Sequence, residues 1–509
     1  MSLTSTAAES AAADLTVLDE EALRHALDDH EAAIPQRFPL DFGGALREPT
    51  RWVEDIDPAT AGVLATVGSA TPEEIGEAVA LARAAAPGWA ATAPSTRGAL
   101  LRRLAELVRG NAEVLARLET RDTGKPLAQG RADITAAARY FEFYGSIVEG
   151  FLGDSIPLGP GSLAVVEHEP HGVTAHVVPW NYPAQITARS VGASLAVGNA
   201  TVVKPADEAP LVALCYARLA RAAGFPAGVL NVLPGGAEAG AALTAHPDID
   251  HVSFTGSVAT GRTVARACAD RGRPALLELG GKSAHLVLAG ADIDRAAPVI
   301  ARALLLHAGQ TCTAGTRVIV HESLHEELIA ALTPYFDNAT LGLGLADPTV
   351  GPVVSAPQAE RVRGFIARAS AEGAVLAGRA EEADGLSGYF VAPVLFDQVS
   401  QDSELFAEEV FGPVLAVTTV ASDAEAVAAA HNSRYGLTAA VWCRDIDRAV
   451  RTARALEVGQ AYINGYAPGG GVELPFGGTR DSGYGREKGV EALREYTRPR
   501  TLFVDLSGA

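Results

Sequence analysis

The sequence predicts an α/β protein with two domains, each built around a parallel sheet. Short apolar runs rich in β-branched residues end in Gly, Pro or polar turns, and Ala/Leu-rich stretches of helical period lie between them. Strand, helix and strand at this spacing indicate βαβ units, whose right-handed crossovers place helices on both faces of the sheet. The length of 509 residues also favours two or more domains, because a single core rarely grows beyond about 250–300 residues.

The strands of the first sheet are expected in the middle of the chain, at 173–180, 200–207, 228–236, 251–257 and 275–281. A helix is predicted at 210–224, between the second and third of these strands. The pattern restarts after Gly281, with strands predicted at 283–290, 316–322 and 414–420 and helices at 323–336 and 358–370. A last strand at 500–508 follows the final helix and needs a sheet to join, which another subunit could supply.

Composition and charge exclude several classes of partner. Hydrophobic residues make up 48% and charged residues 20%, which is ordinary for a globular protein, and the formal net charge is −20. Such a charge argues against nucleic acid and anionic membranes as partners. No stretch of about 20 apolar residues is present. The acidic start, read as an Ala/Ser-rich tip before a short amphipathic helix, resembles neither a signal nor a transit peptide, so we expect a cytoplasmic protein.

Four widely spaced cysteines indicate a reducing compartment rather than a disulfide scaffold or a zinc site. Cys215, Cys268 and Cys443 lie in apolar or helical surroundings and are expected to pack in cores. Cys312 differs because it lies between two threonines in "HAGQTCTAG". Taken alone it is better interpreted as a packing residue than as a nucleophile.

Residues suited to binding and catalysis follow the predicted strands of the first domain. Ligands of open α/β sheets bind beyond the carboxyl ends of the strands, and the residues found there are Trp180, Asn181, Lys204, Asp207, Gly256 and Glu278. No G-x-G-x-x-G follows any of these strands, so the motifs alone give a dinucleotide site moderate support. A helix N-terminus can still hold a phosphate, and Asp207 could bind ribose hydroxyls and repel a 2′-phosphate.

Seven motifs in one order resemble the signature set of the NAD(P)-dependent aldehyde dehydrogenase superfamily. They are "PWNYP", "VVKPA", "FTGS", "LELGGKS", "GQTCTAGTR", "EEVFGPV" and "PFGGTRDSGYGRE". The resemblance covers roughly residues 50 to 500. It implies that an aldehyde is oxidised to a carboxylic acid through a thiohemiacetal and a thioester, with NAD as the cofactor and NADP as a weaker alternative.

The resemblance also implies roles for individual residues. Cys312 would be the nucleophile, Glu278 the general base, and the Asn181 amide with the Cys312 backbone N–H the oxyanion hole. The cofactor would contact residues at several strand ends, namely Pro179, Trp180, Lys204, Asp207, Gly256, Ser257, Leu279, Glu409 and Phe411. Core packing for Trp180 and Phe411, and a solvated strand end for Lys204, remain alternatives.

Three positions depart from the family pattern. Asp207 stands where the family commonly has glutamate, and Ser190 stands nine residues after Asn181, where many members have a lysine assigned to a proton relay. Arg189 resembles a tunnel arginine of members that act on succinate semialdehyde, where it could pair with a substrate carboxylate. A pair with a local acid, or a place in a subunit interface, is the alternative for Arg189. The substrate is accordingly expected to be aromatic or carboxylate-bearing.

The resemblance implies two Rossmann-like domains and a small β oligomerisation flap. We expect an N-terminal extension at 1–40, an NAD-binding domain at 41–149 and 171–281, a flap at 150–170 and 495–509, and a catalytic domain at 282–494. A homodimer or homotetramer is expected. Two alternative functions stay open: oxidation in which CoA rather than water takes the acyl group, and a binding protein that has kept the fold without catalysis.

Overall fold

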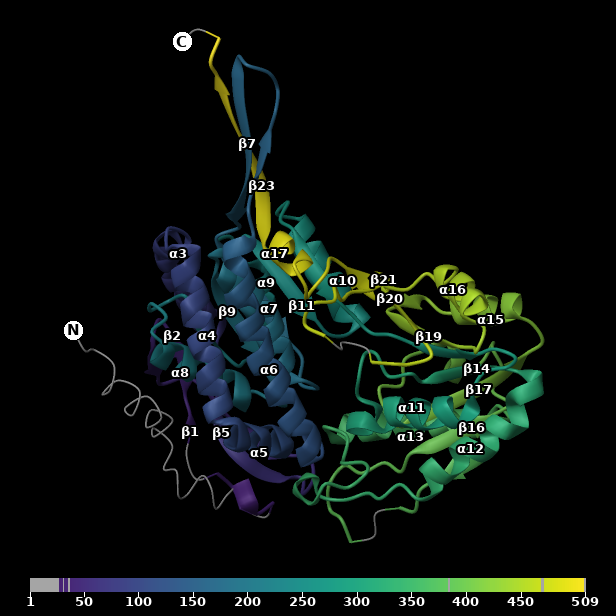
Figure 1. Ribbon diagram of the computed structural model, residues 1–509. Helices are drawn as coiled ribbons and strands as arrows, with labels where there is room; N and C mark the ends of the chain where they lie inside the picture. The colour runs from purple at the N-terminus through teal and green to yellow at the C-terminus, as the bar shows by residue number, and fades with distance from the viewer. Residues whose placement is uncertain (1–26, 31, 35–36, 383–384, 468–470, 508–509) are drawn as a thin grey trace.

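The computed structural model describes residues 27–30, 32–34, 37–382, 385–467 and 471–507. These residues form two lobes, each around a mostly parallel sheet covered by helices, and a narrow arm that projects from one lobe (Figure 1). The amphipathic helix expected within the first 31 residues falls mostly outside the described residues.

The first lobe holds an eight-stranded sheet in the order β22-β12-β11-β8-β9-β10-β2-β3. Its five central strands pair in parallel, and they are β12 (Ala275–Glu278), β11 (His251–Thr255), β8 (Val173–Val178), β9 (Ala200–Pro205) and β10 (Leu230–Val232). These are the five strands predicted for this region. Antiparallel strands complete the edges, namely β22 (Gly483–Tyr484), β2 (Leu40–Phe42) and β3 (Ala45–Arg47).

Helices cover both faces of this sheet (Figure 1). The larger apolar core lies under α4 (Pro94–Gly110), α5 (Ala112–Thr123), α6 (Leu127–Ile147), α7 (Pro183–Val197) and α8 (Leu211–Ala223). A second core lies under α3 (Pro72–Ala90), α9 (Ala237–Ala245) and α10 (Val258–Ala269). Alanine and leucine dominate the buried faces of these helices, which lets them pack closely on the strands.

The second lobe repeats this plan with a seven-stranded sheet in the order β15-β16-β17-β14-β13-β19-β20. The strands are β13 (Ala284–Val287), β14 (Arg317–His321), β15 (Val375–Arg379), β16 (Val394–Asp397), β17 (Val414–Val420), β19 (Thr438–Trp442) and β20 (Gln460–Ile463). Only the β15–β16 pair is antiparallel. The surrounding helices are α11 (Ile293–Leu305), α12 (His325–Asp337), α13 (Ala356–Ala371), α14 (Glu404–Ala407), α15 (Asp423–His431) and α16 (Ile446–Arg454).

The arm is a three-stranded antiparallel sheet in the order β23-β7-β6. The strands are β6 (Asp154–Ile156), β7 (Ser162–Pro170) and β23 (Thr497–Asp505), and β23 follows the short helix α17 (Glu491–Glu495). The last predicted strand therefore pairs along its whole length with β7 of its own chain. The arm extends well beyond the lobes (Figure 1) and exposes the apolar side chains of Leu502, Phe503 and Val504.

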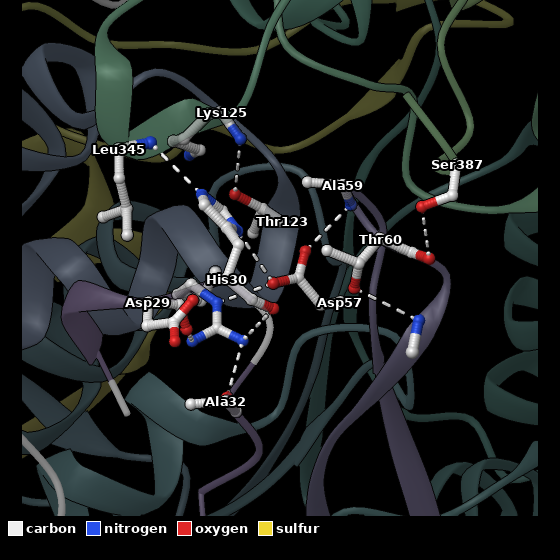
Figure 2. A network of polar contacts seen from close by, with 12 residues as sticks. Asp29, His30, Ala32, Asp57, Ala59, Thr60, Thr123, Lys125, Leu345 and Ser387 are labelled. Carbon is white, nitrogen blue, oxygen red and sulfur yellow. Dashed lines mark hydrogen bonds and ion pairs between the residues drawn. The ribbon is translucent and has the colours of Figure 1, made fainter. Parts of the chain in front are cut away.

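A buried polar network fastens the N-terminal segment to the first lobe (Figure 2). Asp57, the last residue of β4 (Trp52–Asp57), lies 2.9 Å from His30 Nδ1 and accepts from Arg121 Nε at 2.6 Å. Arg121 also donates to the carbonyl oxygens of His30 and Ala32, at 3.1 and 3.0 Å. These contacts hold the chain just before β1 (Arg37–Phe38) against α5, and β1 and β4 both pair with β5 (Gly62–Gly68).

The strand order locates the most favourable place for a ligand. From β8 the chain runs outward through β9 and β10, then returns to put β11 on the other side of β8. At such a reversal the loops leave in opposite directions and open a crevice at the carboxyl ends of the strands. In the part of the chain that the structure describes, no helix is long and apolar enough to cross a membrane and no cluster of three metal-ligating side chains is found.

Candidate active site

Cys312 lies on an irregular segment between α11 and β14. His307 and Ala308 have positive φ angles of 49° and 54°, and at Gly309, where φ is 72°, an added Cβ would lie 2.3 Å from the carbonyl oxygen of Gly412. The chain therefore bends sharply before the cysteine. All four cysteines are free, and Cys312 is half-buried whereas the other three are buried.

The thiol of Cys312 is protonated at neutral pH. Burial raises its pKa to about 12; the nearby Arg189 guanidinium opposes this, and the carboxylates of Glu278 and Glu409 add to it. Thiolate is the reactive form of cysteine. A cysteine can form a thiolate because its pKa is lowered or because a neighbouring base takes its proton. The pKa of Cys312 is raised, so a neighbouring base would be needed here.

Glu278 is the last residue of β12. Its side chain is buried, and neither carboxylate oxygen has a hydrogen-bond partner among the described residues. Burial raises the pKa of Glu278 well above its usual value, Glu487 raises it further, and Arg189 lowers it. An unpartnered carboxylate with a raised pKa, close enough to Cys312 to affect the thiol, is a stronger base than an ordinary glutamate.

Asn181 is held beside the segment that carries Cys312 by two hydrogen bonds. Its side-chain Nδ2 donates to the Gln310 carbonyl oxygen at 2.9 Å, and its own carbonyl oxygen accepts from Lys125 Nζ at 3.0 Å. Lys125 is fully buried and held by Glu119 and Asp133, at 2.7 and 2.5 Å. An amide group has two N–H bonds, so one remains for a negative oxygen on a substrate.

The structure brings together the residues predicted to lie near a nicotinamide. The rings of Trp180 and Phe411 meet edge to face, with centroids 5.4 Å apart. Phe411 has a φ of 58°, a conformation that costs energy for a bulky residue and is frequent at binding sites. Glu409 Oε1 accepts from the Gly281 backbone N at 2.9 Å, which places the carboxylate across the loop that follows Glu278.

The remaining predicted cofactor residues lie along the same edge of the sheet. Ser257 caps α10 by accepting from the Thr260 backbone N at 3.3 Å, and Gly256 precedes it directly after β11. Leu279 fills the space where a Cβ at Gly261 would collide with it, at 2.4 Å. Pro179 follows β8 and is half-buried.

Lys204 lies near the end of β9 and Asp207 follows that strand, but no hydrogen bond joins the two side chains. Lys204 Nζ donates to the Pro205 carbonyl oxygen at 2.8 Å, and the side chain is buried rather than solvated. Burial lowers the pKa of Lys204, while Asp207 and Glu208 oppose that effect. Asp207 is exposed, so its carboxylate faces solvent at the place expected for a ribose.

Comparison with known proteins decides the family. Residues 46–502 match the Aldehyde dehydrogenase family. The chain belongs to the aldehyde dehydrogenase family. It is 40% identical to the hydroxyisobutyraldehyde dehydrogenase of Mycolicibacterium austroafricanum, over 454 residues that cover 89% of this chain and 90% of that protein.

Solved aldehyde dehydrogenases share the fold across both lobes. The NAD+ complex of aldehyde dehydrogenase from Bacillus cereus superposes with a TM-score of 0.91 at 38% identity, covering 94% of this chain and 98% of that one. Betaine aldehyde dehydrogenase from Staphylococcus aureus, also in complex with NAD+, gives a TM-score of 0.89 at 32% identity, covering 92% and 94%. The chain is therefore an enzyme of the aldehyde dehydrogenase type, with the α/β fold that the sequence predicted.

A cavity of about 660 Å³ leads to Cys312 in this aldehyde dehydrogenase. Its walls carry four aromatic side chains and two guanidinium groups, namely Tyr140, Tyr182, Tyr466, Phe476, Arg189 and Arg302. Arg302, in the last turn of α11, is exposed, and its guanidinium group has no ion pair or hydrogen bond within the described part of the chain. No sequence motif singles out Arg302, which belongs to an ordinary amphipathic helix.

Arg189 lies in the wall of this cavity but already has an acidic partner. Its Nε forms a buried ion pair with Glu487, and its guanidinium lies 5.0 Å from the centre of the Phe476 ring. The alternative of pairing with a local acid is thus observed, although Glu487 is 298 residues away in sequence. Arg189 Nη2 is buried and has no hydrogen-bond partner among the described residues.

Ser190 points into a buried hydrogen-bond chain of the first lobe. Its hydroxyl lies 3.2 Å from His176 Nδ1, and His176 Nε2 lies 2.9 Å from Thr174 Oγ1. Burial lowers the pKa of His176 to about 3, so its ring is neutral. The observed contacts of Ser190 are therefore with His176 rather than with Glu278.

Proposed function

We propose that this enzyme oxidises an aldehyde to the carboxylic acid with NAD, through covalent adducts on Cys312. The observation that carries the proposal is the half-buried thiol at the end of the cavity, next to an unpartnered buried carboxylate on the neighbouring strand end. In the first step the thiol gives its proton to Glu278 and sulfur bonds to the carbonyl carbon. The Asn181 amide and the Cys312 backbone N–H stabilise the resulting oxyanion.

The second half of the reaction returns the enzyme to its starting state. Bound NAD supplies the acceptor for the hydride that leaves the carbon, and the product on Cys312 is a thioester. After Glu278 has released its proton to solvent, it accepts one from a water molecule that attacks this thioester. The C–S bond breaks, the acid leaves, and Cys312 is regenerated.

The residues at the strand ends fit a dinucleotide. The crevice lies where the strand order reverses, and the N-terminus of α10 beside Gly256 and Ser257 can receive a phosphate. Trp180, Leu279 and Phe411 offer an apolar surface for the nicotinamide side, while Glu409 offers a carboxylate for ribose hydroxyls. Lys204 and Asp207 would hold the adenosine ribose. The NAD+ bound to the Bacillus cereus and Staphylococcus aureus relatives supports the same cofactor here.

Asp207 is expected to set the preference for NAD over NADP. Replacing it by serine removes a like-charge interaction with a 2′-phosphate that is worth about 1–4 kcal/mol at close range. The ratio of kcat/KM for NADP to that for NAD should therefore rise about tenfold or more in the Asp207→Ser variant. Glu208→Gln, which removes the adjacent exposed carboxylate, is the matched control, and an equal rise in both variants would contradict a specific role for Asp207.

The identity of the acyl acceptor, water or CoA, distinguishes the proposed reaction from CoA-acylating oxidation. A CoA-acylating enzyme would release acyl-CoA and form little free acid unless CoA were added. The buried carboxylate of Glu278 supports water as the acceptor, because a base beside the thioester is what hydrolysis needs. Product analysis with and without CoA tests this choice. The binding-protein alternative would gain if purified protein formed no NADH with a broad panel of aldehydes.

We further propose an aromatic or carboxylate-bearing aldehyde as the substrate. Aromatic rings line the cavity, and Arg189 keeps Nη2 without a partner there. The relative from Mycolicibacterium austroafricanum is named for hydroxyisobutyraldehyde, a neutral hydroxyaldehyde, so the two guanidinium groups are what favours a carboxylate in this chain. A guanidinium binds a carboxylate well when water is excluded from the pair.

Arg189→Ala should discriminate between charged and neutral substrates. Hydrogen bonds to charged groups are worth about 1.5–3 kcal/mol, so kcat/KM for succinate semialdehyde and carboxybenzaldehydes should fall about 10- to 100-fold more than for straight-chain aldehydes and benzaldehyde. NADH formation measures each rate. A melting curve measures how much stability the variant loses when the ion pair with Glu487 is removed. Arg302→Ala, at the other cavity guanidinium, measures in the same assay how much that group adds to the preference for a carboxylate. An equal loss for both substrate classes would refute a carboxylate contact at Arg189.

We propose a homodimer or homotetramer in the cytoplasm. The exposed apolar side chains of β23 lie on an arm that projects from the body, and such a surface suits contact with a second copy. We assign the arm strands to the flap proposed at 150–170 and 495–509, the first lobe to the NAD-binding domain and the second lobe to the catalytic domain. Four free cysteines support a reducing compartment.

A further inference from the structure

The two residues that flank Cys312 are each hydrogen-bonded to a tyrosine of the cavity wall. Tyr182 Oη lies 2.8 Å from Thr311 Oγ1, and Tyr466 Oη donates to the Thr313 carbonyl oxygen at 2.6 Å. The tyrosines come from different lobes, since Tyr182 immediately precedes α7 and Tyr466 follows β20. The segment that carries the nucleophile is thus held from both sides.

Tyr182 is itself held firmly on the first lobe. The ammonium group of Lys125 lies 4.4 Å from the centre of the Tyr182 ring, a distance typical of a cation–π contact. Lys125 is buried and bound by the carboxylates of Glu119 and Asp133, so it cannot follow a moving ring. The same ammonium group donates to the carbonyl oxygen of Asn181, which joins the position of Tyr182 to that of the oxyanion-hole residue.

Tyr466 is held on the second lobe by a chain of hydroxyl groups. Its Oη lies 2.7 Å from Thr438 Oγ1, and Thr438 Oγ1 lies 2.8 Å from Ser283 Oγ. A phenol has one proton, and here it goes to the Thr313 carbonyl, so Thr438 donates to Tyr466 and Ser283 donates to Thr438. The ring also packs edge to face on His285, with centroids 4.5 Å apart.

The nucleophile needs such supports because its own segment is irregular. His307 and Ala308 have positive φ angles and the segment belongs to no strand or regular helix at Cys312. Reacting atoms must be placed closely for catalysis, and misplacement by about 1 Å can cost about 100-fold in rate. Hydrogen bonds on both neighbours restrict the backbone on each side of the cysteine.

We infer that Tyr182 and Tyr466 are positioning residues, which hold Thr311 and Thr313 so that the Cys312 thiol faces the aldehyde. Both rings also line the cavity, so an aldehyde that packs between them presses on the groups that hold the nucleophile. The inference rests on the proposed role of Cys312, and it identifies the two tyrosines as the groups that orient the thiol.

The variants Tyr182→Phe and Tyr466→Phe test the inference because each keeps the ring and removes the hydroxyl. Each should lower kcat, and the rate at which iodoacetamide alkylates Cys312, about three- to tenfold, as expected for the loss of one hydrogen bond. KM should change less than kcat because the cavity walls keep their rings. NAD affinity should be unchanged. Alkylation is measured on the Cys312 peptide by mass spectrometry.

Tyr462→Phe is the matched control. Its ring packs on Tyr466, with centroids 5.5 Å apart, but its hydroxyl donates to Gln460 Oε1 at 2.8 Å and does not contact the nucleophile segment. Iodoacetamide should alkylate Cys312 in the Tyr462→Phe variant as fast as in the unmodified enzyme, and kcat should be the same. A general effect of losing a tyrosine hydroxyl in this region would appear in this variant too, and would argue against the inference.

A double-mutant cycle separates positioning from general loosening of the fold. Thr311→Val removes the partner of Tyr182, so the pair Tyr182→Phe and Thr311→Val should cost no more than either alone. Additive losses, or wild-type alkylation and kcat in both tyrosine variants, would overturn the inference while leaving Cys312 as the nucleophile. Turnover by Cys312→Ala would instead overturn the proposed function.

Discussion

Replacing Cys312 by alanine is expected to abolish NADH formation and to leave NAD binding intact. The thiol supplies the bond to the substrate carbon, so no other group can form the thioester, and the loss should be roughly 10⁴-fold or greater. The substitution removes one sulfur atom from a half-buried position, so the fold should hold. NADH absorbance measures turnover, and fluorescence titration measures the cofactor's affinity.

The other cysteines provide the control for this prediction. Cys268 is buried in the first lobe, and Cys268→Ala should lower stability slightly without changing kcat for any aldehyde. Mass spectrometry during turnover should find the acyl group on the peptide that contains Cys312. Residual turnover by Cys312→Ala at more than a trace, or an acyl group on a different residue, would contradict the central assignment.

The strands that carry the site could be predicted because their pattern is local. β-branched runs that end in Gly, Pro or polar turns reveal a buried parallel strand within about eight residues. Asn181, Lys204 and Glu278 lie at or just after the carboxyl ends of such strands, so their gathering at one edge of the sheet required no knowledge of side-chain contacts. Because β8, β9, β11 and β12 pair in parallel, their carboxyl ends lie at the same edge of the sheet.

Contacts between distant segments could not be predicted in the same way. The resemblance implies a cavity position for Arg189, but its partner Glu487 comes from near the end of the chain, just after β22 at the edge of the first-lobe sheet. Lys125 shows no sequence signal at all, yet it fixes Asn181 and Tyr182. The raised pKa of Cys312 also depends on burial and on neighbouring charges that only the folded chain assembles.

The last strand could be predicted from the sequence, but its pairing partner could not. The sequence predicts a strand at 500–508, and β23 is present at Thr497–Asp505. Its partner β7 is more than 300 residues earlier, and no local feature identifies which edge will accept it. The apolar side chains of β23 that stay exposed are not covered by any other part of the described chain.

Replacing Glu278 by glutamine is expected to slow release of the acid far more than formation of the thioester. The amide is similar in size but cannot take a proton from water, and loss of a general base typically costs about 10²–10⁴-fold. Rapid mixing with aldehyde and NAD should therefore give a burst of NADH close to one per site, followed by slow turnover. If Glu278 also deprotonates the thiol, as we propose, the burst itself will be slower than in the unmodified enzyme.

The pH dependence supplies a second test of the same residue. Burial raises the pKa of Glu278, so the carboxylate is ionised, and able to act as a base, only above that raised value. The rate of thioester hydrolysis should accordingly rise with pH through the raised pKa, and Glu278→Gln should lose this rise. Glu408→Gln is the control, because Glu408 pairs with Arg434 at 2.7 Å on the surface and should leave the profile unchanged.

The combined outcome decides between hydrolysis and transfer to CoA. Hydrolysis assisted by Glu278 requires that the variant accumulate acyl-enzyme, and that added CoA leave acid formation by the unmodified enzyme unchanged. An unaltered kcat in Glu278→Gln, with acyl-CoA as the product when CoA is present, would contradict the role of Glu278. The buried carboxylate, which no described residue neutralises by a hydrogen bond, would then lack an explanation in the chemistry. Because burying an unpartnered carboxylate is costly for stability, its presence at the thioester is best explained by the water that it must activate.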